Sequence, residues 1–349
     1  MTLAAVVAAA MFIGVIAYAL SAGADFGSGF YDLTAGRGAH GNELRTLVDN
    51  SIGPVWEANH VWLIYILVMW WTGFPKAFAA ATTTLFIPFM LALVGIVLRG
   101  ASFAFRKYAE TFTQARLFGA VFAGSSLMPP FFLGTVAGAI ASGRIPAAGY
   151  GDRINSWVNP TSLIGGCLAV TTCVFLAGVF LTADAARAGI PGLTARLRKR
   201  TLTVGLAAGL IVFAGLYPIL HDAPTLSHGL MRAGLPLLIM AGFAGSTTLI
   251  LIYRRMYSPA RVFAATAVAS VVVGWGVGQY PWMLVDQLTI NDAGGASATL
   301  RAQLVVVMLA AVIVLPALGY LLRLIHTSTG GESSVQIAEP RVQIESAGT

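Results

Sequence analysis

Charged residues are scarce in this chain of 349 residues. Asp, Glu, Lys and Arg together make up 10% of it, whereas hydrophobic residues make up 57%. Soluble globular domains usually carry about 25% charged residues, and the mean hydropathy of +0.79 is far above their range. The composition therefore excludes a soluble globule. It predicts an all-α integral membrane protein, because a helix satisfies its own backbone hydrogen bonds in lipid.

Cysteine and histidine are also rare, with two and five residues. Cys167 and Cys173 lie six positions apart on one predicted helix and so point to different faces, which favours core packing over a disulfide or a metal pair. Only His60 among the histidines lies well inside a hydrophobic segment. Haem in a helical bundle needs axial ligands on facing helices, so we expect no haem and no metal bound by this chain.

Runs of about 20 apolar residues predict membrane-spanning helices. Nine such runs are present, near residues 3–22, 53–74, 79–99, 117–141, 161–183, 201–220, 235–253, 261–284 and 302–323. No Pro- or Ser-rich linker separates them, so we expect one membrane-embedded domain over residues 1–326. Residues 327–349 are polar without an apolar face, which predicts a disordered cytoplasmic tail.

The net charge of +7 could suggest nucleic-acid binding, but the basic residues lie in short connections rather than on one face. The connections after the first, third, fifth and seventh predicted spans and the C-terminal tail hold sixteen of the 21 Lys and Arg residues, Arg99 included. The other side holds five. The positive-inside rule predicts an outer N-terminus and a cytoplasmic C-terminus.

Two ionisable side chains interrupt the second predicted span, in the stretch from Asn50 to Trp62. Glu57 and His60 lie three residues apart and share a helix face. Asp25 is expected just past the first span, near the same end of the membrane. Charged groups within a bilayer are costly and are usually functional, so these residues either handle protons or form a buried polar cluster that joins two helices.

The fourth predicted span contains Met128-Pro129-Pro130. Proline has no backbone N–H and its ring clashes with the preceding turn, so we expect a kink here. Packing is the favoured interpretation of this kink over a gate.

Three segments together resemble a known family. Gly23-Ala24-Asp25-Phe26-Gly27-Ser28-Gly29, the stretch from Asn50 to Trp62, and Leu98-Arg99-Gly100-Ala101-Ser102-Phe103-Ala104-Phe105-Arg106 are similar to the first three motifs of subunit II of cytochrome bd-type quinol oxidases. The likeness is close over about the first 110 residues. Beyond them it rests on length, hydropathy and the Pro129-Pro130 pair.

The resemblance implies a subunit of a respiratory terminal oxidase in the bacterial cytoplasmic membrane, built as two four-helix bundles plus one peripheral helix. Its haem-bearing partner, subunit I, would carry b-type and d-type haems, oxidise quinol and reduce O2 to water. A small single-helix subunit and a structural quinone accompany some members. Subunit II itself would bind no haem and would not be catalytic alone.

The resemblance also assigns roles to matching residues. Glu57 replaces the usual Asp of a cytoplasmic proton path, Asn59 follows it in the same triplet, and Trp62 matches a tryptophan associated with oxygen access. Arg99 and Gly100 fall in the third motif and are expected, with Pro129 and Pro130, to be structural or to lie at an interface.

This chain departs from the family pattern at one acidic position. The residue before Gly23 is usually acidic, and here it is Ala22. His60 stands where Gln or Glu is common. We therefore expect a shifted proton route through Glu57 and His60, with Asp25 at its mouth. The alternatives are a purely structural or assembly subunit and, less favoured, a proton-coupled transporter, which would show paired broken helices around a midplane site.

Overall fold

The computed structural model describes residues 2–36, 38–106, 108 and 111–328. Within the helices, the side chains of residues 52–58, 106, 112, 115, 315, 318, 319 and 321–328 lie outside this description. The described backbone is almost entirely helical, as the composition predicts. The only strands among these residues form one short hairpin.

The helices and strands follow one another with short connections. They are α1 (Leu3–Leu33), α2 (Ala39–Gly73), α3 (Pro75–Thr84), α4 (Phe86–Arg106), α5 (Phe112–Ser125), α6 (Met128–Ala141), α7 (Pro160–Arg187), α8 (Pro191–Asp222), α9 (Pro224–Gly229), the π-helical turn η1 (Leu230–Gly234), α10 (Leu235–Tyr253), α11 (Tyr257–Gln279), β1 (Trp282–Leu284), β2 (Leu288–Thr289), α12 (Ile290–Ala293) and α13 (Ser297–Ser328).

The described residues contain eight helices that are long and apolar enough to cross a membrane, or nine when α2 and α3 count as one bent span. This agrees with the nine spans predicted. The prolines also act as predicted: α5 ends at Ser125, α6 starts at Met128, and Pro129 and Pro130 occupy the first turn of the new helix, where a missing N–H costs nothing.

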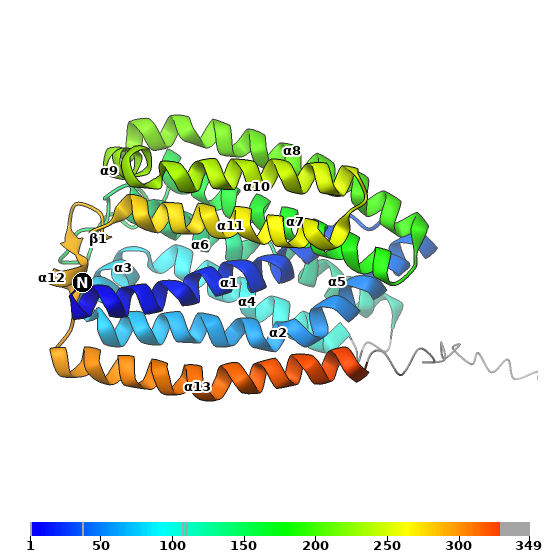
Figure 1. Ribbon diagram of the computed structural model, residues 1–349, viewed down its shortest axis with the longest axis horizontal. Coiled ribbons are helices and arrows are strands. Elements are labelled where there is room, and N and C mark those ends of the chain that lie inside the picture. The colour runs from blue at the N-terminus through cyan, green and yellow to red at the C-terminus, as the bar shows by residue number, and fades with distance from the viewer. Residues whose placement is uncertain (1, 37, 107, 109–110, 329–349) are drawn as a thin grey trace, which may run out of the picture. The chain divides into compact units, whose positions relative to one another are not determined.

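Residues up to Leu300 form one compact unit, and the chain from Arg301 onward belongs to a second unit, described here as the helix α13. In the first unit, α1, α2, α4 and the α5–α6 pair form one four-helix group, with α3 joining α2 to α4. The helices α7, α8, α10 and α11 form another group. The contacts of α7 with α1 and α6 hold the groups together, and the long helices run side by side (Figure 1).

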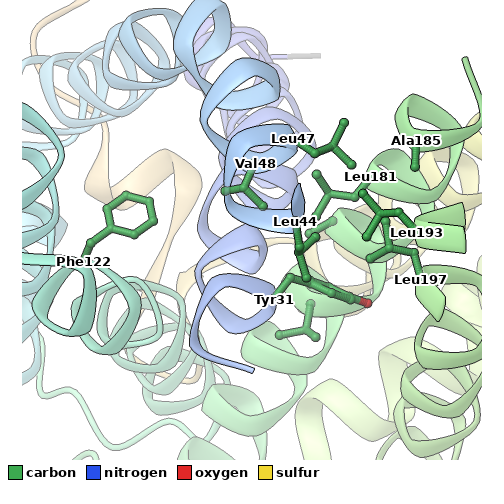
Figure 2. Packing of buried hydrophobic residues seen from close by; sticks show 11 residues of the cluster. Tyr31, Leu44, Leu47, Val48, Phe122, Leu181, Ala185, Leu193 and Leu197 are labelled. Atoms are coloured by element: carbon green, nitrogen blue, oxygen red, sulfur yellow. The ribbon is translucent and has the colours of Figure 1, made fainter. Parts of the chain in front are cut away.

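A cluster of buried hydrophobic side chains lies where the two groups meet. Tyr31 of α1 and Leu44 of α2 face Leu181, Leu193 and Leu197 of α7 and α8 in Figure 2. Burying each such leucine contributes about 1.5–3 kcal/mol where water is the alternative. Several of these residues lie close to the ends of their helices, where an unburied side chain would contact water rather than lipid.

Four boundaries differ from the sequence-based prediction. The helix α1 continues eleven residues past the predicted end at residue 22, so the prediction that Asp25 lies beyond the helix was wrong. The third span starts at Phe86 rather than near residue 79, because residues up to Thr84 belong to the separate helix α3, which is bent by 115° from α2. The eighth ends at Gln279, and Trp282 lies in β1. Of the predicted tail, residues 327 and 328 end α13 and the rest lies outside the described residues.

Candidate functional site

A buried ion pair between Asp25 of α1 and Arg99 of α4 is the centre of the first helix group. One guanidinium nitrogen of Arg99 lies 2.6 Å from Asp25 Oδ1 and the other lies 3.0 Å from Oδ2, so the pair is bidentate. The side chains are each 2% exposed. A charge in such a position is tolerated only when it is paired and hydrogen-bonded, and this pair meets both conditions.

The third nitrogen of the Arg99 guanidinium also has an acceptor. Its Nε donates to Ser126 Oγ at 2.9 Å, and the Ser126 hydroxyl donates in turn to the carbonyl of Phe122. The guanidinium lies 5.1 Å from the ring centroid of Phe26 and 4.9 Å from that of Phe122, within cation–π range. The interruption between α5 and α6 therefore places Ser126 where α4 needs an acceptor.

The approach of α1 to its neighbours depends on small residues. A Cβ atom at Gly27 would collide with the backbone carbonyl of Cys173 on α7, and one at Gly29 would collide with the side chain of Ser126. Small residues that let helix backbones approach closely are typical of membrane interiors. Gly27 and Gly29, which follow Asp25, therefore let α1 pack closely against its neighbours.

Asn59 brings the helix α2 into the same network. Its Nδ2 donates to Asp25 Oδ2 at 3.0 Å, and the residue is 2% exposed. Its Oδ1 is buried and accepts no hydrogen bond among the described residues. Of the predicted proton-path residues, the structure thus brings Asp25 and Asn59 together, and His60 follows on the same helix, half-buried and in contact with other groups. The side chain of Glu57 lies outside the described residues.

The other predicted site residues have packing contacts. Trp62 is half-buried, and its ring meets that of Tyr65 edge-on at 6.2 Å. Pro129 is buried against Gly95 of α4, where an added Cβ would come within 2.8 Å of the proline ring. Gly100 is half-buried beside Arg99.

An apolar cavity of about 320 Å³ lies between α1, α6, α7 and α11. Ala22, Tyr18, Pro130, Cys173 and Trp275 are among the residues that line it. No Asp, Glu, Lys or Arg lines it. Cys173 thus packs inside as predicted, whereas Cys167 is exposed and the prediction of core packing was wrong for it.

Sequence reasoning missed the partners of the buried charges. Arg99 was counted as a residue of a basic connection, but it lies inside α4 and pairs with an acid 74 positions away. Asp184 of α7 similarly pairs with Arg261 of α11 and accepts from Ser51. A charged residue at the edge of an apolar run indicates in the sequence that a buried ion pair could form there. It does not reveal which residue is the partner. Among the described residues, no three His, Cys, Asp or Glu side chains form a metal-binding group.

These features define a class: a multi-span, all-helical membrane protein with a buried ion pair at the centre of one helix group. The family model for cytochrome bd terminal oxidase subunit II matches residues 3–325. The chain therefore belongs to the family of cytochrome bd terminal oxidase subunit II, a family of multi-pass membrane proteins of bacterial oxidases.

Individual relatives agree with this assignment. Cytochrome bd ubiquinol oxidase subunit 2 of Bacillus subtilis is 29% identical over 180 residues, which cover 51% of each chain. Cytochrome bd-I ubiquinol oxidase subunit 2 of Escherichia coli K12 is 28% identical over 174 residues, covering 48% of this chain and 45% of the relative. The aligned part thus spans about half the length of these curated relatives.

A solved structure shows the same fold. The bd oxidase of Geobacillus thermodenitrificans contains a chain that matches with a TM-score of 0.77 and 24% identity, covering 93% of this chain and 99% of that one. At this identity the likeness concerns the fold alone.

Proposed function

We propose that this chain is the haem-free subunit II of a bd-type quinol oxidase and holds the haem-bearing subunit I in the membrane. The complex would oxidise quinol and reduce O2 to water, with all haems in the partner. Membership of the subunit II family over residues 3–325 is the observation that carries this proposal. The names of the relatives, both quinol oxidase subunits, support it.

We infer a second task for the chain, the supply of protons to the partner. Each electron that reaches a buried haem needs a compensating proton, because an unneutralised charge in a low-dielectric interior is costly. Glu57 and His60 on α2 are the residues of this chain that could exchange protons along the route. The Oδ1 of Asn59, which has no hydrogen-bond donor among the described residues, is an acceptor for a water molecule on the same helix.

Asp25 has a different part in this route. Arg99 binds both of its carboxylate oxygens through charge-assisted hydrogen bonds. Asp25 is therefore proposed as a fixed charge that orients Asn59 and so sets the orientation of α2, while Glu57 and His60 carry the proton. Trp62, on the same helix, is proposed to border the path of oxygen.

A structural quinone also fits this chain. The apolar cavity of about 320 Å³ would hold isoprenoid units. The indole Nε1 of Trp275, which lines the cavity, is buried and has no acceptor among the described residues, so it would donate to a ring carbonyl. A bound quinone supplies reversible two-electron chemistry in general, but the role proposed for it here is to fill the cavity.

The orientation follows from the basic connections. Removing Arg99 from the count leaves fifteen basic residues on the side predicted to be cytoplasmic against five on the other. The N-terminus is therefore proposed outside and the C-terminus in the cytoplasm.

Replacing Glu57 by Gln tests the proton route in the purified complex. Quinol-dependent oxygen uptake should fall by about tenfold or more, within the range for loss of a proton-transferring group, while the haem absorbance spectrum stays unchanged. Glu43→Gln is the matched control, because Glu43 lies on the same helix but is exposed and pairs with Arg196. Equal oxygen uptake in both variants would reject the route and leave the assembly role. Loss of haem in the Glu57 variant alone would also assign the residue to assembly.

A further inference from the structure

A basic pocket lies at one end of the second helix group, away from the Asp25 network. Its volume is about 300 Å³, and it forms where α7 ends, α8 begins and α10 turns into α11. The residues that line it are Ala186, Gly189, Ile190, Pro191, Thr194, Ala195, Arg198, Arg255 and Tyr257. Two of these are arginines and none is acidic.

The guanidinium of Arg198 is held in place by backbone acceptors. Its Nε donates to the carbonyl of Ile252 at 3.0 Å and its Nη2 donates to that of Tyr253 at 2.6 Å, while its plane lies over the Tyr253 ring. No carboxylate neutralises this guanidinium among the described residues. Arg198 therefore presents a fixed, uncompensated positive charge to the pocket.

Arg255 is the second charge, and its backbone is unusual. Its φ is 61°, in the left-handed region that favours Gly and Asn and disfavours long side chains. Its side chain is exposed and makes no hydrogen bond or ion pair within the described part of the chain. A strained arginine without an internal partner suggests a side chain retained for an external ligand.

The surroundings have a large excess of positive charge. Residues 184–200 and 254–261 contain eight Lys and Arg residues but only one acid, Asp184. That acid is already engaged by Arg261 and by Arg187. The pocket therefore selects for an anion.

Apolar surface continues from the pocket along the helices. Leu206 and Leu210 of α8 and Phe243 and Ile250 of α10 are exposed by 53–63%, as expected of side chains that face lipid. A ligand with a charged head and long apolar chains would satisfy both surfaces at once. Basic pockets between the ends of membrane helices bind anionic lipid headgroups in other proteins.

We propose that this pocket binds the phosphate group of an anionic phospholipid through Arg198 and Arg255, with the acyl chains along α8 and α10. The phosphate would accept charge-assisted hydrogen bonds from both guanidinium groups. A phosphate free in solution shares this chemistry but would not use the apolar faces.

The test uses the purified oxidase complex in detergent, titrated with phosphatidylglycerol and separately with phosphatidylcholine, with bound lipid counted by native mass spectrometry. Arg255→Asn removes the charge while introducing a residue that tolerates the left-handed backbone, so the fold is preserved. Arg254→Asn is the matched control, because Arg254 is the adjacent exposed arginine and does not line the pocket. An unchanged haem spectrum verifies both complexes.

Arg255→Asn should weaken binding of phosphatidylglycerol at one site by about tenfold, the effect of losing one hydrogen bond to a charged group. Arg254→Asn should change it by less than about twofold, and phosphatidylcholine should bind weakly to all three proteins. Equal losses in the two variants, or none in either, would overturn the proposal. Displacement of the lipid by millimolar inorganic phosphate would overturn it too, by assigning the pocket to a soluble anion.

Discussion

Neutralising both members of the Asp25–Arg99 pair should destabilise the complex by clearly less than the sum of the two single neutralisations. In Arg99→Gln the carboxylate of Asp25 stays buried without its counter-charge, and in Asp25→Asn the guanidinium does. Breaking a buried pair from one side costs about 3–5 kcal/mol. Exposed side-chain fractions of 2% on both partners leave little solvent to reduce that cost.

The double variant Asp25→Asn with Arg99→Gln removes both charges. The new side chains can still hydrogen-bond to Asn59 and Ser126. The double variant should therefore lose at least about 2 kcal/mol less unfolding free energy than the two single variants lose in sum. Thermal unfolding of the detergent-solubilised complex provides the measurement. At about 2 °C per kcal/mol for a chain of this size, each single change should lower the midpoint by about 6–10 °C.

Additivity would refute this reasoning. If the double variant loses the sum of the single losses within about 0.5 kcal/mol, the two charges do not interact energetically. Arg99→Lys provides a second comparison, because it keeps the charge but not the bidentate geometry or all of the contacts with Ser126 and the aromatic rings. Its midpoint should lie between those of the native protein and Arg99→Gln.

Three further perturbations have defined outcomes. Gly27→Ala should destabilise the complex by at least about 1–3 kcal/mol through its collision with α7, whereas Gly119→Ala, with open space around it, should be neutral in the same thermal assay. Arg255→Asn should raise stability by about 1 kcal/mol by relieving its left-handed backbone, seen as a higher unfolding midpoint. The backbone amides of residues 155 and 154 lower the pKa of Asp152 below its usual 3.8. The stability that the Asp152 carboxylate gives to the turn at residues 152–155 is therefore complete above about pH 4 and is lost as pH falls through the lowered pKa. At pH 7, Asp152→Ala should show faster hydrogen exchange at the amides of residues 154 and 155.

Sequence alone predicted the number of spans, because about 20 apolar residues are needed to cross the membrane whatever their neighbours are. It also predicted the break at Pro129 and Pro130, which follows from local backbone chemistry. It failed where the deciding contact is distant. Gly27 of α1 packs against the α7 backbone at Cys173, and Arg99 is buried in an ion pair with Asp25. Neither partner can be identified from one sequence, because nothing in the local pattern encodes it.

The missing acid at position 22 has a consequence for how protons could move. Ala22 is buried and lines the apolar cavity, which no charged residue lines. A charged proton carrier at that position would need a counter-charge, and no Asp, Glu, Lys or Arg lines the cavity. Asp25, three residues further along α1, is instead held by Asn59 of α2 and Arg99 of α4. The proton route that we propose therefore follows α2, and replacement of Glu57 or His60 should separate proton supply from assembly.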